Sequence, residues 1–137
     1  MFHLEVRQGR LLEARVHSLT TLEDARAYTA DLVRITGTSS EPLVLCADHR
    51  RVRIYSQVVS DELASLFGKM NSRLERVVVI VSRSNATLAL QLERIVREAH
   101  NPMRHVYYDV PPAIEFLRGS LGPAEVARAT VFLNEPL

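Results

Sequence analysis

The stretch that decides the fold is Pro42-Leu43-Val44-Leu45-Cys46-Ala47 (PLVLCA), a short and uninterrupted apolar run. A strand with one face in water alternates apolar and polar residues, whereas a strand covered on both faces is apolar throughout. Val77-Val78-Val79-Ile80-Val81 is a second such run, and its β-branched residues favour strands. The two runs predict central strands that lie side by side, or nearly so, in one sheet.

The residues before the first run predict a hairpin and a helix. Phe2–Arg7 and Leu12–Val16 each alternate apolar and polar residues, with Gly9 between them, as two strands with one buried face do. A helical stripe follows, with a capping-box spacing at Thr20–Glu23 and Gly37 placed just past the expected helix end. The stripe consists of Leu22, Ala25, Tyr28, Leu32 and Ile35.

The residues after the first run alternate helix and strand. One helical stripe runs from Val59 to Met70, with Asp61 and Glu62 expected at the helix start. A second runs from Leu88 to Ala99 behind an Asn85 cap. The remaining segments predict a short strand at 106–108, a short helix carrying Ile114, Phe116 and Leu117, and a last helix at 124–133.

The predicted element order is therefore β-β-α-β-α-β-α-β-α with an extra C-terminal helix. A hairpin followed by alternating strands and helices is typical of an α/β fold with a mixed sheet. We expect residues 1–119 to form the α/β domain. Residues 120–137 form a tail whose helix is expected to pack on the domain or on a dimer partner.

The composition is that of an ordinary soluble domain and excludes several classes of protein. The chain has 137 residues, 47% hydrophobic and 24% charged, which suits a single domain. Its net charge of +1 supplies no field for nucleic acid or acidic membranes. No apolar run is long enough to span a bilayer, and a single cysteine suits a reducing compartment, so we expect a cytoplasmic protein.

The candidate site is the stretch after the first buried strand, Asp48-His49-Arg50-Arg51-Val52-Arg53-Ile54-Tyr55-Ser56. In open α/β sheets, ligands and partners collect at the carboxyl ends of the strands. The loop after the second buried strand reaches the same edge. Together the two loops could bind an anion or an acidic partner, or both could be solvated connections whose charges pair weakly. The candidate residues are His49, Arg50, Arg51, Arg53, Tyr55, Ser82, Arg83 and Ser84.

Other chemistry is missing from the sequence. The five histidines share no ligand spacing and there is no cysteine pair, so we expect no metal. No nucleophile elbow, phosphate loop or dinucleotide fingerprint is present, so we expect neither a cofactor nor an enzyme. Cys46 is expected to pack as a small hydrophobe. Tyr107 and Tyr108 should face opposite sides, one in the core and the other exposed or at an interface.

The second half of the chain resembles the small stand-alone STAS-like domains, relatives of the bacterial anti-sigma factor antagonists. The features that carry the resemblance are the strand Val77–Val81, the helix that ends at Ala99-His100-Asn101-Pro102, the strand that ends at Tyr107-Tyr108-Asp109, and the helix Ala113–Leu117. The element order from Phe2 to Leu117 agrees as well. The resemblance implies a regulatory domain that acts through protein partners.

The resemblance also implies a place for a switch. The antagonists are phosphorylated on a serine at the start of the helix after the first central strand, in an Asp-Ser-Ser-Gly motif. Ser56, in Ile54-Tyr55-Ser56-Gln57, falls at this place, while Tyr55 stands where the acid would be and no glycine follows. Our first hypothesis is a non-catalytic interaction domain switched by phosphorylation at Ser56. The alternative is a homodimer that binds a small apolar or anionic ligand.

Overall fold

The computed structural model describes residues 1–136 and confirms an α/β fold with a mixed sheet. The last position of the predicted tail, 137, lies outside the described residues. The elements in chain order are β1 (Phe2–Gln8), β2 (Leu11–Val16), α1 (Leu22–Gly37), β3 (Leu43–Asp48), α2 (Gln57–Lys69), β4 (Leu74–Ile80), α3 (Ala86–Arg97), β5 (Arg104–Tyr107), α4 (Val110–Leu117) and α5 (Pro123–Leu133).

The five strands follow their chain order across the sheet, β1-β2-β3-β4-β5. The hairpin β1–β2 is antiparallel and every other pair is parallel. The two apolar runs are neighbours, with Leu45 opposite Val77 and Cys46 opposite Val78, as the sequence predicts. β1 and β5 form the two edges of the sheet.

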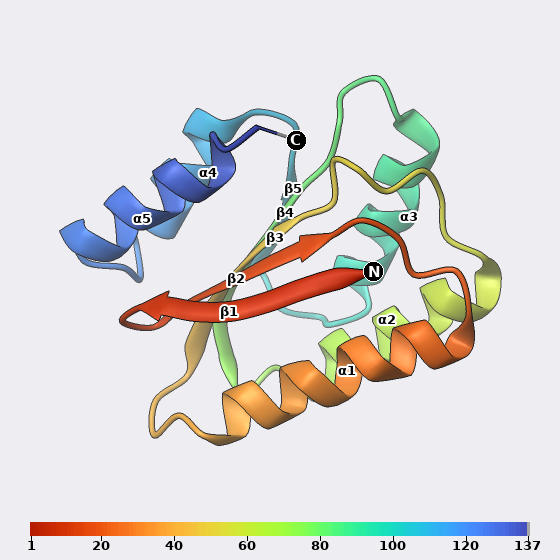
Figure 1. Ribbon diagram of the computed structural model, residues 1–137, viewed down its shortest axis with the longest axis horizontal. Coiled ribbons are helices and arrows are strands. Elements are labelled where there is room, and N and C mark those ends of the chain that lie inside the picture. Colours follow the sequence, from red (N-terminus) through yellow and green to blue (C-terminus); the bar gives the residue numbers. More distant parts are fainter. Residues whose placement is uncertain (137) are drawn as a thin grey trace.

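Helices cover both faces of the sheet, which explains the continuous apolar runs (Figure 1). α1, α2 and α3 lie on one face, and α4 and α5 lie on the other. Side chains of a strand alternate between faces. Leu45 and Ala47 therefore join the core beneath the first three helices, while Val44 and Cys46 join the core beneath α4 and α5.

Three predicted helix boundaries are wrong by a few residues. α1 is capped by Thr21 and Asp24 instead of Thr20 and Glu23, because the Asp24 carboxylate accepts from the backbone N–H of Thr21. Its end is Thr38, and Gly37 is still helical. α2 begins at Gln57, so Asp61 and Glu62 fall beyond its first turn. The predicted Asn85 cap of α3 is confirmed, with its carbonyl oxygen 3.1 Å from the Leu88 nitrogen.

Polar contacts hold α5 on the sheet. Arg128 on α5 binds the buried Glu13 carboxylate of β2 through two hydrogen bonds of 2.7 Å. In the first turn of the helix, the Glu125 carboxylate accepts from the backbone N–H of Arg10, next to Gly9 in the hairpin turn. Apolar side chains of the tail join the same core as α4, so the tail packs on the domain itself.

In the described part of the chain, no helix combines the length and the apolar character that crossing a bilayer requires.

Candidate functional site

The two candidate loops lie together at the carboxyl edge of the sheet. The backbone N–H of His49, after β3, donates to Ile80 at the end of β4 over 2.8 Å. The Asn85 side chain, after β4, donates to the carbonyl of Arg53 over 2.8 Å. Since one side chain both caps α3 and binds the loop before α2, the two loops form one continuous surface.

Asp48 and Arg50 are bound within the fold. The Asp48 carboxylate is 2% exposed and accepts from Nε and Nη2 of Arg50 over 2.9 and 3.0 Å. Burial raises the pKa of Asp48, but the hydrogen bonds from Arg50 and the charges of Arg50 and Arg15 outweigh it, so this pKa lies below its ordinary value. Arg50 also donates to the carbonyl of Leu133 at the end of α5 over 2.8 Å. Arg50 therefore stabilises the fold.

The basic side chains of the two loops do not converge. Arg51 turns toward β2, where it lies 3.1 Å from Nδ1 of His17. Arg83 turns the other way, forms an ion pair with Asp109 and lies 5.4 Å from the ring centre of Tyr108. A joint anion site would need Arg50 and Arg51 to face Arg83, and the structure lacks that arrangement.

His49 and Tyr55 are buried and bind each other. The Tyr55 hydroxyl lies 2.9 Å from Nδ1 of His49, and both side chains are about as buried as the core. Burial lowers the pKa of His49 to about 4 and raises the pKa of Tyr55 well above its ordinary value. The backbone of Tyr55 exchanges two hydrogen bonds, of 3.0 and 2.7 Å, with the side chain of Gln91 on α3. Tyr55 and Gln91 thus fix the loop to α3. The side chains of His49 and Tyr55 are buried and therefore inaccessible to a ligand.

Ser56 is exposed and caps α2. Its hydroxyl accepts from the backbone N–H of Val59 over 3.3 Å, which satisfies one of the free donors at the helix start. Ser82 and Ser84 also lie at this edge and share a hydrogen bond of 2.8 Å. Of the exposed predicted site residues, Arg53 is the one whose side chain forms neither a hydrogen bond nor an ion pair with the described residues.

Exposed apolar side chains lie on either side of Ser56, on α3 and just after β5, and most of them were not predicted from the sequence. They are Ile54 and Val58 beside Ser56, Leu90 on α3, and Tyr108 after β5, with 59%, 55%, 72% and 40% exposed. Gln91 and Tyr55 join the segments that carry Leu90 and Ile54. Tyr107 packs against the core under α4, so the expected opposite orientation of the two tyrosines is confirmed. The sequence did hold one indication that Leu90 is exposed: it lies outside the helical stripe formed by Leu88, Leu92 and Ile95.

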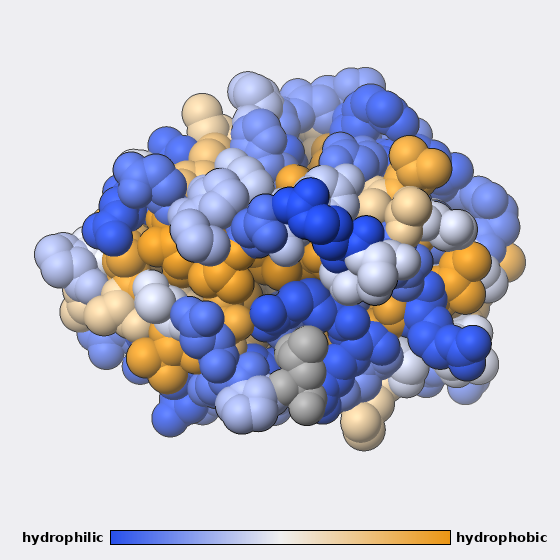
Figure 2. Space-filling model, turned by 90° about the horizontal axis from the view of Figure 1, so that it is seen from above, coloured by the Kyte–Doolittle hydropathy of each residue, from blue (hydrophilic) through white to orange (hydrophobic). Residues whose placement is uncertain are grey.

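We define the edge surface as Arg53, Ile54, Ser56, Val58, Arg83, Leu90 and Tyr108. A hollow of about 300 Å³ lies within it, lined by Arg83, Ala86, Ala89, Leu90 and Tyr108. Figure 2, which views the molecule from above, shows hydrophilic residues over the middle of this face and separate hydrophobic groups toward the α3 side. The edge surface thus carries several separate exposed apolar groups, together with Arg53 and Arg83.

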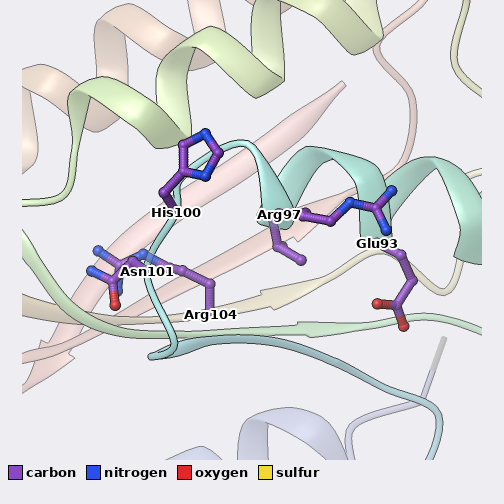
Figure 3. A pocket seen from close by; sticks show the side chains of 6 residues that line it. Glu93, Arg97, His100, Asn101 and Arg104 are labelled. Atoms are coloured by element: carbon purple, nitrogen blue, oxygen red, sulfur yellow. The ribbon is translucent and has the colours of Figure 1, made fainter.

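A second hollow, of about 380 Å³, lies at the end of α3 (Figure 3). Arg104 is buried there and donates to the carbonyl of Leu74 over 2.6 Å, and burial lowers its pKa to about 10. In Figure 3, Arg97 extends along the helix toward Glu93, and the ring of His100 points away from Arg104. Because the cationic groups diverge, this hollow has no anion-binding geometry.

Within residues 1–136, no group of three or more acidic, histidine or cysteine side chains is arranged to hold a metal ion. In comparisons with known proteins, no protein-family model matches the chain and no curated protein is similar to it.

Proposed function

We propose that this chain is a non-catalytic cytoplasmic regulatory domain of the STAS-like kind, which binds a protein partner through the edge surface. The observation that carries the proposal is an exposed serine at a helix start with exposed apolar side chains on either side of it. Apolar side chains at the surface that are rimmed by charge favour protein contacts. Ile54, Val58 and Leu90 supply the apolar area and Arg53 and Arg83 the rim.

Phosphorylation of Ser56 is the proposed switch. A phosphate group adds a charge of about −1.5 to −2 and is favoured at a helix start, where backbone N–H groups are free. It would place that charge between Ile54 and Val58, in the apolar part of the edge surface. A partner that covers these side chains would have to bury the charge, so phosphorylation should release it.

The buried state of the polar residues supports a non-catalytic role. Asp48, His49 and Tyr55 are the residues of the loop with acid–base chemistry; the Asp48 carboxylate is bound by Arg50, and the buried side chains of His49 and Tyr55 bind each other. The alternative of a small-ligand binder has less support, because the hollow within the edge surface opens to solvent and small ligands favour enclosing pockets.

Capture of partners from native extract tests the edge surface. Leu90→Glu adds a charge to its most exposed apolar side chain, and Val131→Glu, at a position 55% exposed on α5, is the matched control. We expect proteins that are retained by the wild type and by Val131→Glu but lost by Leu90→Glu. Equal retention of every protein by Leu90→Glu and the wild type would contradict the proposal.

Two variants of Ser56 test the switch separately. Aspartate and asparagine both cap helices well, and only aspartate adds charge. We expect Ser56→Asp to release the captured partner and Ser56→Asn to retain it. Mass spectrometry of the protein from its native cells should find phosphate on Ser56, and an unmodified Ser56 under all growth conditions would remove the switch from the proposal.

A further inference from the structure

β1 is an edge strand with free hydrogen-bonding groups. It pairs with β2 on one side only, and in an antiparallel pair the residues that exchange hydrogen bonds alternate along the strand. The backbone N–H of His17 donates to Met1 over 2.9 Å, so the odd-numbered residues of β1 face β2. Phe2, Leu4 and Val6 therefore point their N–H and C=O groups outward, where no other part of residues 1–136 binds them.

The side chains of the same strand are divided between its two faces. Phe2 and Leu4 pack against the core on the α1 side, while Val6 is 39% exposed. A hollow of about 410 Å³ runs along this apolar side between β1 and the end of α1. The opposite face carries His3, Glu5 and Arg7, so a carboxylate stands between an imidazole and a guanidinium, and Nε2 of His3 lies 3.1 Å from the Glu5 carboxylate.

Free backbone groups on an edge strand can pair with another strand. The charges of the side chains that would lie opposite each other determine which pairing is favourable. Consider two copies of β1 in antiparallel pairing, where directly opposite side chains share a face. Three registers, centred on Leu4, Glu5 or Val6, pair the outward N–H and C=O groups at three or more residues of each strand. If the pairing is centred on Glu5, that carboxylate faces the partner's Glu5, and His3 faces the partner's Arg7. The two Glu5 carboxylates repel each other, which disfavours this register.

If the pairing is centred on Leu4, apolar side chains lie opposite apolar ones and no side chains of like charge lie opposite each other. Leu4 then faces the partner's Leu4 and Phe2 faces the partner's Val6 on the apolar face. On the other face, His3 lies opposite the partner's Glu5. Centring on Val6 instead would place Leu4 opposite the partner's Gln8, beyond the irregularity that interrupts β1 between Val6 and Gln8. The Leu4 register uses the regular part of the strand alone.

We infer that β1 pairs with β1 of a second copy of this chain, antiparallel and centred on Leu4, so that one sheet continues across a two-fold axis. The pairing extends the hydrogen-bond ladder through Phe2, Leu4 and Val6 and covers the exposed part of Val6. The interface leaves the loops after β3 and β4 free. The inference thus goes beyond the proposed function and does not depend on it.

Sedimentation velocity over a range from micromolar to several hundred micromolar tests the pairing. The wild type should pass from monomer to dimer. Glu5→Lys places a cation opposite the partner's His3 on both sides of the axis and should raise the dissociation constant by at least about tenfold. Because Glu5 is a partly exposed surface side chain, circular dichroism should show the variant folded.

Paired charge reversals identify the register. His3→Glu combined with Glu5→Lys restores opposite charges in the Leu4 register and should recover the dimer. Arg7→Glu combined with Glu5→Lys would recover it in the Val6 register only, and is the matched control. Recovery by the control alone would overturn the inferred register.

Amide exchange followed by NMR gives a second readout. The N–H groups of Phe2, Leu4 and Val6 should exchange fast in dilute protein and slow down as the concentration rises. Those of His3 and Glu5 face β2 and should be protected throughout. A chain that stays monomeric at every concentration would overturn the inference. So would a dimer in which Glu5→Lys changes nothing and these three amides stay unprotected.

Discussion

Asp48 and Arg50 lie two residues apart at the end of β3 and form a two-pronged ion pair beneath α5. The two contacts measure 2.9 and 3.0 Å, and the same guanidinium reaches the last carbonyl of α5. The most basic stretch of the sequence therefore connects the sheet to the C-terminal helix. Three residues further on, Arg53 is exposed and has no ion-pair partner within residues 1–136.

The two arginines should respond differently to removal. Arg50→Ala leaves the buried Asp48 carboxylate without its main partner and should lower the free energy of unfolding by about 3 to 5 kcal/mol. Arg53→Ala, on the same loop, should change it by less than about 0.5 kcal/mol. Urea unfolding followed by circular dichroism measures both. Equal effects of the two substitutions would show that Asp48 does not depend on Arg50.

His49 should make stability depend on pH. Its pKa of about 4 in the folded chain lies below the ordinary value of 6.5, so between these values the unfolded chain binds a proton that the folded chain does not. Stability should therefore fall as the pH drops from 6.5 to 4, by up to about 3 kcal/mol from this residue. His49→Gln keeps a hydrogen-bonding group for Tyr55 but cannot titrate, and should flatten the profile in this window. An unchanged profile would contradict the assigned pKa.

Two glycine-to-alanine substitutions should change the free energy of unfolding in opposite directions. Gly9 has φ +54°, and a Cβ there would overlap the Glu125 carboxylate that binds the hairpin turn. Gly9→Ala should therefore destabilise the chain by at least about 1 to 2 kcal/mol. At Gly68, on α2, the nearest atom to a new Cβ is 4.0 Å away, so alanine should stabilise the helix by about 0.5 to 1 kcal/mol. Thermal unfolding of both variants checks this: the melting temperature should fall for Gly9→Ala and rise for Gly68→Ala.

Cys46 should report on unfolding of the whole domain. Its thiol is fully buried in β3, and burial raises its pKa well above the ordinary value, so the reactive thiolate is absent from the folded chain. We expect no labelling by a thiol reagent in the native state and rapid labelling in urea. Fast labelling of native protein would mean that α4 and α5 open locally.

The sequence predicted the sheet well because burial on both faces leaves a direct trace in Val44–Ala47 and Val77–Ile80. It predicted helix boundaries less well because neighbouring residues compete for the same capping role. Thr21 and Asp24 prevail over Thr20 and Glu23 through side-chain hydrogen bonds that the spacing of residue types does not reveal.

The candidate site was predictable in position but not in the state of its side chains. The loop after β3 reaches the expected edge, yet Arg50 binds Asp48 and the carbonyl of Leu133 on α5, and His49 is buried against Tyr55. The contact with Leu133 follows from tertiary packing and leaves no local pattern. Leu90 and Tyr108 come together with Arg83 only after α3 and β5 have docked.

The two faces of the sheet are covered by helices at different times as the chain leaves the ribosome. The face beneath α1, α2 and α3 can be covered soon after these helices emerge. The opposite face, with Val44, Cys46, Val78 and Ile80, is covered by α4 and α5, whose residues 110–133 are made after those of α1, α2 and α3. The nascent chain therefore exposes an apolar face until residues 110–133 have been made, and during that interval chaperones or rapid synthesis must keep it from aggregating.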